Sequence, residues 1–337
     1  FMESTIKYPR SISRALLPTP IEPLIRYGKR FKGVDVWIKR DDLTGFELSG
    51  NKVRKLEFSM AAALDQGATS VVTCGGVNSN HCRATSYLAR QLNLDVHLFL
   101  RTPDGQPPAV LQGNTLMNKV AGADIHWIDP DAYLDRDRLM GEFAADQAKQ
   151  GNKVFVIPEG ASDALGAMGF VKAVEEIRQQ LDDIALDITH VVSAVGSGGT
   201  VAGLSAGRDA FNLGWQTLGF AVCDNVPYFQ EIISNIREDL QAYGLPAFDE
   251  SSKVLLNADY QGSGYGLTSS EELREIAEFA RCEGILLDPC YTGTAFIGMN
   301  REITSGAIPM GSKVLFWHTG GALGSFNYES QWRESLS

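Results

Sequence analysis

Residues 38–57 read IKRDDLTGFELSGNKVRKLE, and the rest of the chain can be organised around this stretch. It continues an apolar strand expected at 34–39, crosses a polar loop that contains glycine, and enters a helix at about Asn51. The helix prediction depends on apolar residues that recur at helical spacing and form one buried stripe: Val53, Leu56, Met60, Ala63 and Leu64. Ser49 and Asn51 are residue types that cap helices. Lys52 is therefore expected in the first helical turn.

Three cations, Lys52, Arg54 and Lys55, crowd into this first turn. A helix N-terminus carries unpaired N–H groups and the positive end of the helix dipole, so it favours anions. One interpretation is a solvated basic face near the start of a helix. The other is that an anion binds here and that one lysine has a lowered pKa, which would let it form a Schiff base with a carbonyl compound.

Length, composition and charge limit the class of protein. The 337 residues suffice for two domains or one large α/β unit, and 44% of them are hydrophobic, as in ordinary globular proteins. A formal net charge of −11 argues against nucleic acid as a partner. No apolar run reaches the length of a membrane span, and the N-terminal residues lack the apolar segment of a signal peptide, so a cytoplasmic protein is expected. The five cysteines show no metal-like spacing, and no metal site is predicted.

Strands and helices are expected to alternate along most of the chain. Strands are expected at 34–39, 70–74, 95–100, 125–128, 154–157, 189–194, 218–223 and 314–318. Helices are expected from about 51 to 65, after 80, at 111–121 and 137–150, through 171–177, after 200, and at 228–240 and 271–283. This alternation predicts an α/β fold of mostly parallel sheets with helices on both faces and right-handed crossovers.

A glycine-rich loop follows the strand expected at 189–194 and precedes a helix. It comprises Val195, Gly196, Ser197, Gly198, Gly199 and Thr200. Glycines let successive N–H groups point inward, and a helix N-terminus favours a phosphate. The loop lacks the Gly-Lys-Ser/Thr of a Walker motif and the third glycine of a dinucleotide fingerprint. A flexible turn is the plain alternative, but the loop composition favours binding of a single phosphate monoester.

Other segments place polar or aromatic residues beside expected loops. Residues 78–81, Asn-Ser-Asn-His, stand at another strand-to-helix junction, where they either cap the helix or hold a carboxylate. Tyr265 and Tyr291 lie in loops that contain glycine, which alone is weak evidence for a site. Thr319 follows the last expected strand, where a hydroxyl can reach a ligand in the crevice of an α/β fold.

Together these segments resemble the fold-type-II pyridoxal-phosphate enzymes, and most closely the branch with D-cysteine desulfhydrase and 1-aminocyclopropane-1-carboxylate (ACC) deaminase. The matching motifs are WIKRDD at 37–42, SGNKVRKLEF at 49–58, GGVNSNH at 75–81, GSGGT at 196–200 and HTGG at 318–321. They occur in the family order and span nearly the whole chain. The resemblance implies a homodimer and two α/β domains with the active site between them. The larger, cofactor-binding domain would comprise 1–52 and 161–337, and the smaller one 53–160.

The resemblance also implies roles around the cofactor, pyridoxal 5'-phosphate. Lys52 would be the Schiff-base lysine and would carry the proton at the substrate Cα. Lys55 would support the phosphate together with the loop 195–200. Asn80 would hydrogen-bond the ring oxygen of the cofactor, and Thr319 would face its pyridine nitrogen.

The substrate implied by the resemblance is a small amino acid. Ser79, Asn80 and His81 would hold its carboxylate, and Tyr265 and Tyr291 would flank it. The catalytic residues expected in this scheme are Lys52, Ser79, Tyr265 and Tyr291.

Two threonines separate the branches of the family. This chain has Tyr291-Thr292-Gly293 where the similar motif of ACC deaminases is Tyr-Glu-Gly. It also has Thr319 where ACC deaminases have Leu. A carboxylate at the pyridine nitrogen keeps the ring protonated and strengthens the electron sink. A neutral hydroxyl gives a weaker sink, which suffices for β-elimination because the leaving group takes the electrons.

Thr292 and Thr319 therefore favour β-elimination of D-cysteine to pyruvate, hydrogen sulfide and ammonia, with Thr292 beside the substrate. The alternatives are ACC deamination, β-elimination from another amino acid such as L-cysteate, and a non-catalytic protein that binds the cofactor.

Overall fold

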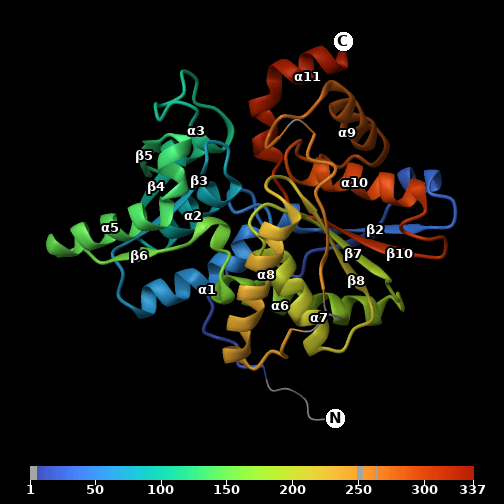
Figure 1. Ribbon diagram of the computed structural model, residues 1–337, viewed down its shortest axis with the longest axis horizontal. Helices are drawn as coiled ribbons and strands as arrows, with labels where there is room; N and C mark the ends of the chain where they lie inside the picture. The colour runs from blue at the N-terminus through green and yellow to red at the C-terminus, as the bar shows by residue number, and fades with distance from the viewer. Residues whose placement is uncertain (1–5, 249–252, 263) are drawn as a thin grey trace.

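The chain contains two separate sheets in the computed structural model, which describes residues 6–248, 253–262 and 264–337 (Figure 1). Residues 1–5 of the predicted larger domain lie outside the described ranges. The larger sheet, on the right in Figure 1, is parallel except for its first strand, which pairs antiparallel with the second. Its strands in spatial order are β1 (Ile21–Pro23), β2 (Asp35–Arg40), β10 (Lys313–His318), β7 (His190–Val195), β8 (Gln216–Ala221) and β9 (Leu255–Asn257).

The smaller sheet, on the left in Figure 1, is parallel throughout. Its strands in spatial order are β5 (Asp124–Ile128), β4 (Asp95–Arg101), β3 (Ser70–Gly76) and β6 (Val154–Val156). The predicted α/β class with two mostly parallel sheets is therefore confirmed. The predicted domain boundaries at 52/53 and 160/161 stay a prediction.

Helices connect the parallel strands, as crossover connections require, and the last helix follows the final strand. They are α1 (Lys52–Asp65), α2 (Asn80–Gln91), α3 (Gly113–Val120), α4 (Pro130–Leu134), α5 (Arg136–Lys149), α6 (Ala164–Asp183), α7 (Gly199–Ala210), α8 (Val226–Asp239), α9 (Ser270–Glu283), α10 (Thr292–Ser305) and α11 (Glu329–Leu336). Within the described ranges, none of them has both the length and the apolar character needed to cross a membrane.

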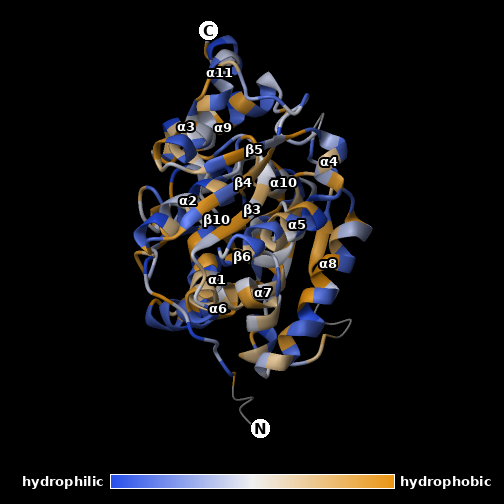
Figure 2. Ribbon diagram, turned by 90° about the vertical axis from the view of Figure 1, so that its left-hand side faces the viewer, coloured by the Kyte–Doolittle hydropathy of each residue, from blue (hydrophilic) through white to orange (hydrophobic). Residues whose placement is uncertain are grey.

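The larger sheet is buried on both faces, and strand β10 shows why. Side chains alternate across a strand, so Phe316 packs with the α9 and α10 side while Leu315 and Trp317 pack against α6 and α7. A parallel strand covered on both faces must be apolar at successive positions. Figure 2 shows this pattern as orange strands inside helices that also carry blue, hydrophilic residues.

A buried charge network attaches the start of α1 to the larger sheet. The Arg54 guanidinium donates to both carboxylate oxygens of Asp41, with Nε–Oδ2 and Nη2–Oδ1 distances of 2.8 Å. Arg54 also pairs with Glu176 of α6 at 2.9 Å, and Glu176 accepts from Lys39 of β2 at 2.6 Å. The indole N–H of Trp317 completes the set by donating to Asp41 at 2.8 Å.

The charges of this network compensate one another. Burial alone would raise the pKa of Asp41, but Arg54 and then Lys39 outweigh it and hold that pKa below its ordinary value. Arg54 is thus a structural cation. It is not part of a solvated basic face, which the sequence had left open as one interpretation of the first turn.

Replacing Asp41 by Asn is expected to lower the free energy of unfolding by roughly 3–5 kcal/mol, because it leaves the buried Arg54 charge partly uncompensated. The matched control is Asp65→Asn, which removes an exposed ion pair with Arg10 and is expected to cost less than about 1 kcal/mol. Urea denaturation followed by circular dichroism measures both. Equal losses for the two variants would contradict the structural role of the network.

Candidate active site

A cavity lies where the carboxyl ends of strands from both sheets approach each other, which is the position at which α/β folds bind ligands. Segments far apart in the sequence contribute to its lining: Asn51, Lys52, Gly75, Gly76, Ser79, Asn80, His81, Glu159, Gly160, Ala194, Val195, Gly196, Ser197, Gly198, Thr200, Val201, Tyr265, Tyr291 and Thr319. Most of the residues singled out in the sequence are brought together here. Lys55, Gly199 and Thr292 are not part of this lining and are described separately below.

Lys52 occupies the first position of α1 and points its amine into this cavity. Burial lowers the pKa of its ammonium to about 8, against the opposing effect of the Glu159 carboxylate. A larger fraction of this lysine is therefore a neutral amine at neutral pH than for an exposed lysine. The neutral form is the one that can act as a nucleophile or accept a proton.

The start of α1 is held by contacts of Asn51 with distant segments rather than by a side-chain cap. Asn51 already has helical dihedral angles (φ −68°, ψ −20°) and makes no capping hydrogen bond, so the predicted cap is wrong. Its side chain instead donates to Thr200 Oγ1 at 3.0 Å, and its backbone N–H donates to the Thr319 carbonyl at 3.0 Å. Gly50 (φ +108°) permits this approach, because a Cβ there would lie 2.7 Å from the Thr319 oxygen.

Lys55 lies one turn further along α1 and is fully buried against the glycine-rich loop. Its Nζ donates to Ser162 Oγ at 2.9 Å, and Ser162 Oγ lies 2.8 Å from Ser197 Oγ and accepts from the Gly199 N–H at 3.2 Å. A Cβ on Gly199 would stand 2.6 Å from the lysine nitrogen. One cation, two hydroxyls and the N-terminus of α7 therefore converge on a small space that suits an oxyanion.

The charge of Lys55 has no ion-pair partner in the part of the chain that the structure describes: its amine makes only the bond to Ser162, and the nearby Asp163 carboxylate acts on it without a direct contact. Burial, and then the nearby Lys52, lower the pKa of Lys55 well below its ordinary value. A buried ammonium is costly without a partner. An anion at this position would remove that cost, which is the strongest structural argument that the loop binds a phosphate.

The N-terminus of α2 also lines the cavity and offers a second position for an anion. Ser79 is the N-cap of this helix, and its Oγ accepts from the Cys82 N–H at 3.1 Å. The Ser79 O–H and the first N–H groups of the helix can then donate to a carboxylate.

The orientation of the Asn80 amide follows from its neighbours. The Arg83 guanidinium donates to Asn114 Oδ1 at 3.0 Å, so the Asn114 amide nitrogen must be the donor toward Asn80 Oδ1 at 2.8 Å. The amide N–H₂ of Asn80 is left to donate to a ligand. This matches the predicted bond to a ring oxygen, which requires a donor.

His81 is neutral and is oriented by Thr73. The Thr73 hydroxyl donates to the Ile157 carbonyl at 2.8 Å, so His81 Nε2, 2.8 Å from the same hydroxyl, must carry its proton. Burial and the nearby Lys52 lower the pKa of His81 well below its ordinary value. Its buried Nδ1 is consequently a lone-pair acceptor, with no hydrogen-bond partner among the described residues. Any contact of His81 with a substrate carboxylate must use the backbone N–H.

Tyr265 and Tyr291 meet at the cavity, with their hydroxyl oxygens 2.5 Å apart. Burial raises the pKa of both hydroxyls well above the ordinary value, so both keep their protons at neutral pH. One O–H serves the bond between them, and the other remains able to donate. Tyr291 also packs beside Gly196, where a Cβ would lie 2.9 Å from its ring.

Thr292 lies behind the cavity lining. It is fully buried at the start of α10, its Oγ1 donates to Asp288 Oδ1 at 2.7 Å, and its own N–H donates to the same oxygen at 2.8 Å. These contacts fix the turn that presents Tyr291. The position thus supports the helix start, whereas Thr319 does line the cavity.

Glu159 is a cavity residue to which the sequence analysis gave no role. It accepts from the Tyr133 hydroxyl at 2.6 Å and lies 3.1 Å from the Arg136 guanidinium. The sequence did contain a feature that could have pointed to Glu159, because this residue lies in a Pro-Glu-Gly turn shortly after β6. The same turn carries Ser162, which contacts Lys55.

Comparison with known proteins identifies the family. Residues 12–320 match the family model described as pyridoxal-phosphate dependent enzyme. The chain belongs to the pyridoxal-phosphate-dependent enzymes. It is 41% identical over 332 residues to the bifunctional D-cysteine desulfhydrase/1-aminocyclopropane-1-carboxylate deaminase, mitochondrial, of Arabidopsis thaliana, a match that covers 95% of this chain and 80% of that protein. The enzyme is therefore a pyridoxal-phosphate-dependent lyase of the ACC deaminase/D-cysteine desulfhydrase family.

Solved structures agree with this assignment. The crystal structure of an ACC deaminase homologue superposes with a TM-score of 0.88 at 35% identity, covering 98% of this chain and 97% of that one. A fungal L-serine ammonia-lyase from Rhizomucor miehei shares the fold, with a TM-score of 0.66 at 17% identity, covering 94% of this chain and 98% of that one.

The cavity fits the cofactor of this family. The uncompensated Lys55 with Ser162 and the loop before α7 suits its phosphate, and Thr200 adds a hydroxyl fixed by Asn51. Asn80 would hold the ring oxygen, and Lys52 would make the covalent attachment.

Replacing Lys55 by Met is expected to weaken cofactor binding by about 10- to 100-fold, because a charge-assisted hydrogen bond to the phosphate contributes about 1.5–3 kcal/mol. Titration of cofactor-free enzyme with pyridoxal phosphate, followed by absorbance, measures this. Lys149→Met, at an exposed position of α5, is the matched control and should bind as the unchanged enzyme does. Unaltered affinity in Lys55→Met would exclude Lys55 as a phosphate ligand.

The lowered pKa of Lys52 predicts how cofactor uptake depends on pH. Covalent attachment needs the neutral amine, so the rate of uptake by cofactor-free enzyme should rise about tenfold between pH 7 and pH 9 and then level off. Stopped-flow absorbance over this range checks the prediction. A rate that keeps rising beyond pH 10 would show that Lys52 retains the pKa of an exposed lysine.

Proposed function

We propose that this enzyme catalyses β-elimination of D-cysteine to pyruvate, hydrogen sulfide and ammonia. The observation that carries the proposal is that neither Thr319, which lines the cavity, nor Thr292 supplies a carboxylate. The sequences of ACC deaminases are expected to have Leu in place of Thr319 and Glu in place of Thr292. A cavity without a carboxylate from either position favours an elimination in which the leaving group takes the electrons.

The side chains divide the reaction between them. Bound pyridoxal phosphate would supply the electron sink for charge at the substrate Cα. The neutral amine of Lys52 accepts the Cα proton, and the N-terminus of α2 with Ser79 holds the carboxylate. Both groups line the same cavity: Lys52 begins α1 and Ser79 caps α2.

The tyrosine pair supports departure of the sulfur. The Cβ–S bond breaks with its electrons on sulfur, and the O–H not used between Tyr265 and Tyr291 can donate a hydrogen bond to the departing hydrosulfide. The proton that Lys52 took from Cα completes hydrogen sulfide and restores the neutral amine. The released three-carbon enamine takes up one water and yields pyruvate and ammonia. Each atom of D-cysteine and water is thereby accounted for.

ACC deamination is the second candidate, because the Arabidopsis relative is named for both activities. It would require cleavage of a cyclopropane ring without a leaving group, and the neutral Thr292, in place of the Glu expected in ACC deaminases, disfavours it. Both substrates therefore belong in one experiment.

The holoenzyme is assayed with D-cysteine, L-cysteine, L-cysteate and ACC, with release of sulfide, sulfite, pyruvate and 2-oxobutyrate as the measured quantities. Sulfide and pyruvate in equal amounts from D-cysteine are expected as the main activity. In Lys52→Ala the rate of sulfide release should be at least about 100-fold lower, since a positioned proton carrier contributes about 10²–10⁴-fold to the rate. The control Lys149→Ala should retain the full rate.

If the enzyme turned over only ACC or only L-cysteate, that compound would take the place of D-cysteine as the proposed substrate. Full activity of Lys52→Ala would overturn the role of this lysine, whichever substrate is used.

A further inference from the structure

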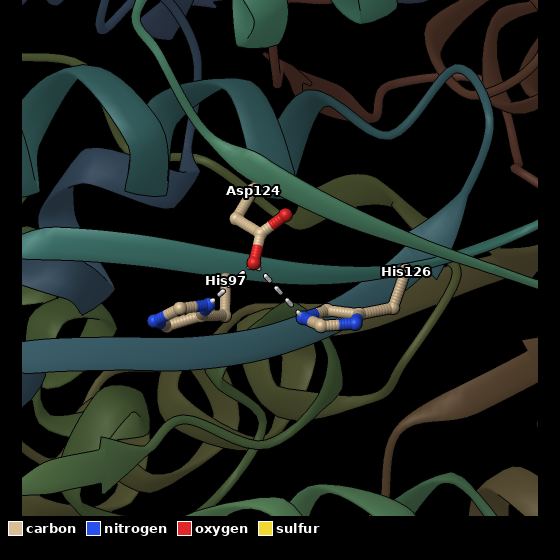
Figure 3. A group of neighbouring side chains, drawn as sticks. All are labelled: His97, Asp124 and His126. Carbon is tan, nitrogen blue, oxygen red and sulfur yellow. Dashed lines mark hydrogen bonds and ion pairs between the residues drawn. The ribbon is translucent and has the colours of Figure 1, made fainter. Parts of the chain in front are cut away.

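A second group of chemistry-bearing side chains lies on the smaller sheet, outside the cavity lining. His97 of β4 and Asp124 and His126 of β5 point toward one another from adjacent strands (Figure 3). The parallel register places His97 opposite Asp124, and His126 follows two residues later on the same face. The three side chains thus share one face near the edge of the sheet, because β5 is the outermost strand.

The distances suit shared coordination of one ion. Asp124 Oδ2 lies 3.2 Å from His97 Nδ1 and 3.5 Å from His126 Nε2, and one ligand atom of each residue lies within 4.8 Å of the others. A tetrahedral metal with bonds of about 2.0–2.2 Å separates its ligand atoms by roughly 3.3–3.5 Å. The 3.5 Å separation lies within this range, and the 3.2 Å separation, which is a hydrogen bond between His97 and Asp124, lies just below it.

The surrounding rings hold the two imidazoles in place. Phe99 stacks on His126 with centroids 4.7 Å apart, and Phe143 of α5 contacts His97 at 4.6 Å and His126 at 5.1 Å. The His126 Nε2 atom is buried and has no hydrogen-bond partner among the described residues. Asp124 Oδ2, at 3.5 Å, is too far for a hydrogen bond; a buried nitrogen without a hydrogen bond is unfavourable, and an ion bound to it would satisfy it. Asp124, with a side chain 64% exposed, leaves a path from solvent.

We propose that His97, Asp124 and His126 form a binding site for a divalent transition-metal ion of the zinc class. Two imidazoles and one carboxylate are the ligand set that such ions prefer, whereas magnesium and calcium prefer oxygen ligands alone. Three protein ligands leave a further coordination position for water. The bound ion would link the edge strand β5 to β4 and would be separate from the lyase chemistry.

The site is tested with zinc(II) alone and the purified holoenzyme, by equilibrium competition with a chromophoric chelator. One zinc ion per chain is expected to bind in competition with the chelator. His126→Ala and Asp124→Asn should each weaken this binding at least tenfold, because even outer-shell partners of metal ligands are worth 10–100-fold. Asp146→Asn, which changes an exposed carboxylate of α5 in the same way, is the matched control and should bind as the unchanged protein does.

A second measurement identifies the ligands directly. Electron paramagnetic resonance of the holoenzyme with one equivalent of copper(II) is expected to show two coordinated nitrogens, and one after His126→Ala. Unchanged cofactor absorbance in each variant shows that it has folded, and Asp124→Asn alters only a largely exposed side chain.

Absence of tight zinc binding to the unchanged protein would overturn the proposal. Equal affinity in the unchanged protein and in Asp124→Asn and His126→Ala would do the same, since the zinc would then bind elsewhere on the chain.

Discussion

The buried pair between Arg54 and Asp41 sets the position on which the active site depends. It attaches the first turn of α1 to the larger sheet, while Glu176 and Trp317 attach the same charges to α6 and β10. Lys52 and Lys55 lie on either side of Arg54 in the sequence, so a displacement of this turn would move both. Charges buried at this depth are stable only as a matched set, which makes the position of the turn specific.

This constraint explains how two neighbouring lysines come to differ. Lys52 at the helix start reaches the open cavity, where burial lowers its pKa only to about 8. Lys55, almost one turn later, contacts Ser162 beside the loop before α7 and has no ion-pair partner in the described part of the chain. The first can exchange protons with a ligand, whereas the second requires an anion. The cluster of three cations therefore has three separate roles, because Arg54 is neutralised by protein carboxylates.

The local sequence predicted a large part of this arrangement. The strand before residue 40, the helix from Lys52 and the parallel α/β class all follow from apolar periodicity and are confirmed. Short edge strands such as β1 and β9 were not predicted, because three residues carry too little periodic signal. Helix α10 was also not predicted, since its start is fixed by a side-chain contact between Thr292 and Asp288 rather than by its own pattern.

Predictions that needed one residue's orientation were less successful. Asn51 is a residue type that often caps helices, yet its side chain donates a hydrogen bond to Thr200, which is distant in the sequence. For His81, the structure limits how the predicted contact with a carboxylate can form: Thr73 fixes the proton on Nε2 and leaves Nδ1 as an acceptor, so only the backbone N–H can donate, and the contact itself stays a prediction. Glu159 received no role because only the fold brings it near Lys52.

The sequence by itself determined the fold class, the glycine-rich loop and the lysine at the start of α1, because periodicity, loop composition and helix-end chemistry are local properties. Only the tertiary structure decided which cation of the 38–57 stretch is neutralised by protein and which awaits an anion. It also brought His97 within 3.2 Å of Asp124, a residue 27 positions away. Both outcomes depend on strand order and register, which are set by packing between distant segments and leave no signal in either segment alone.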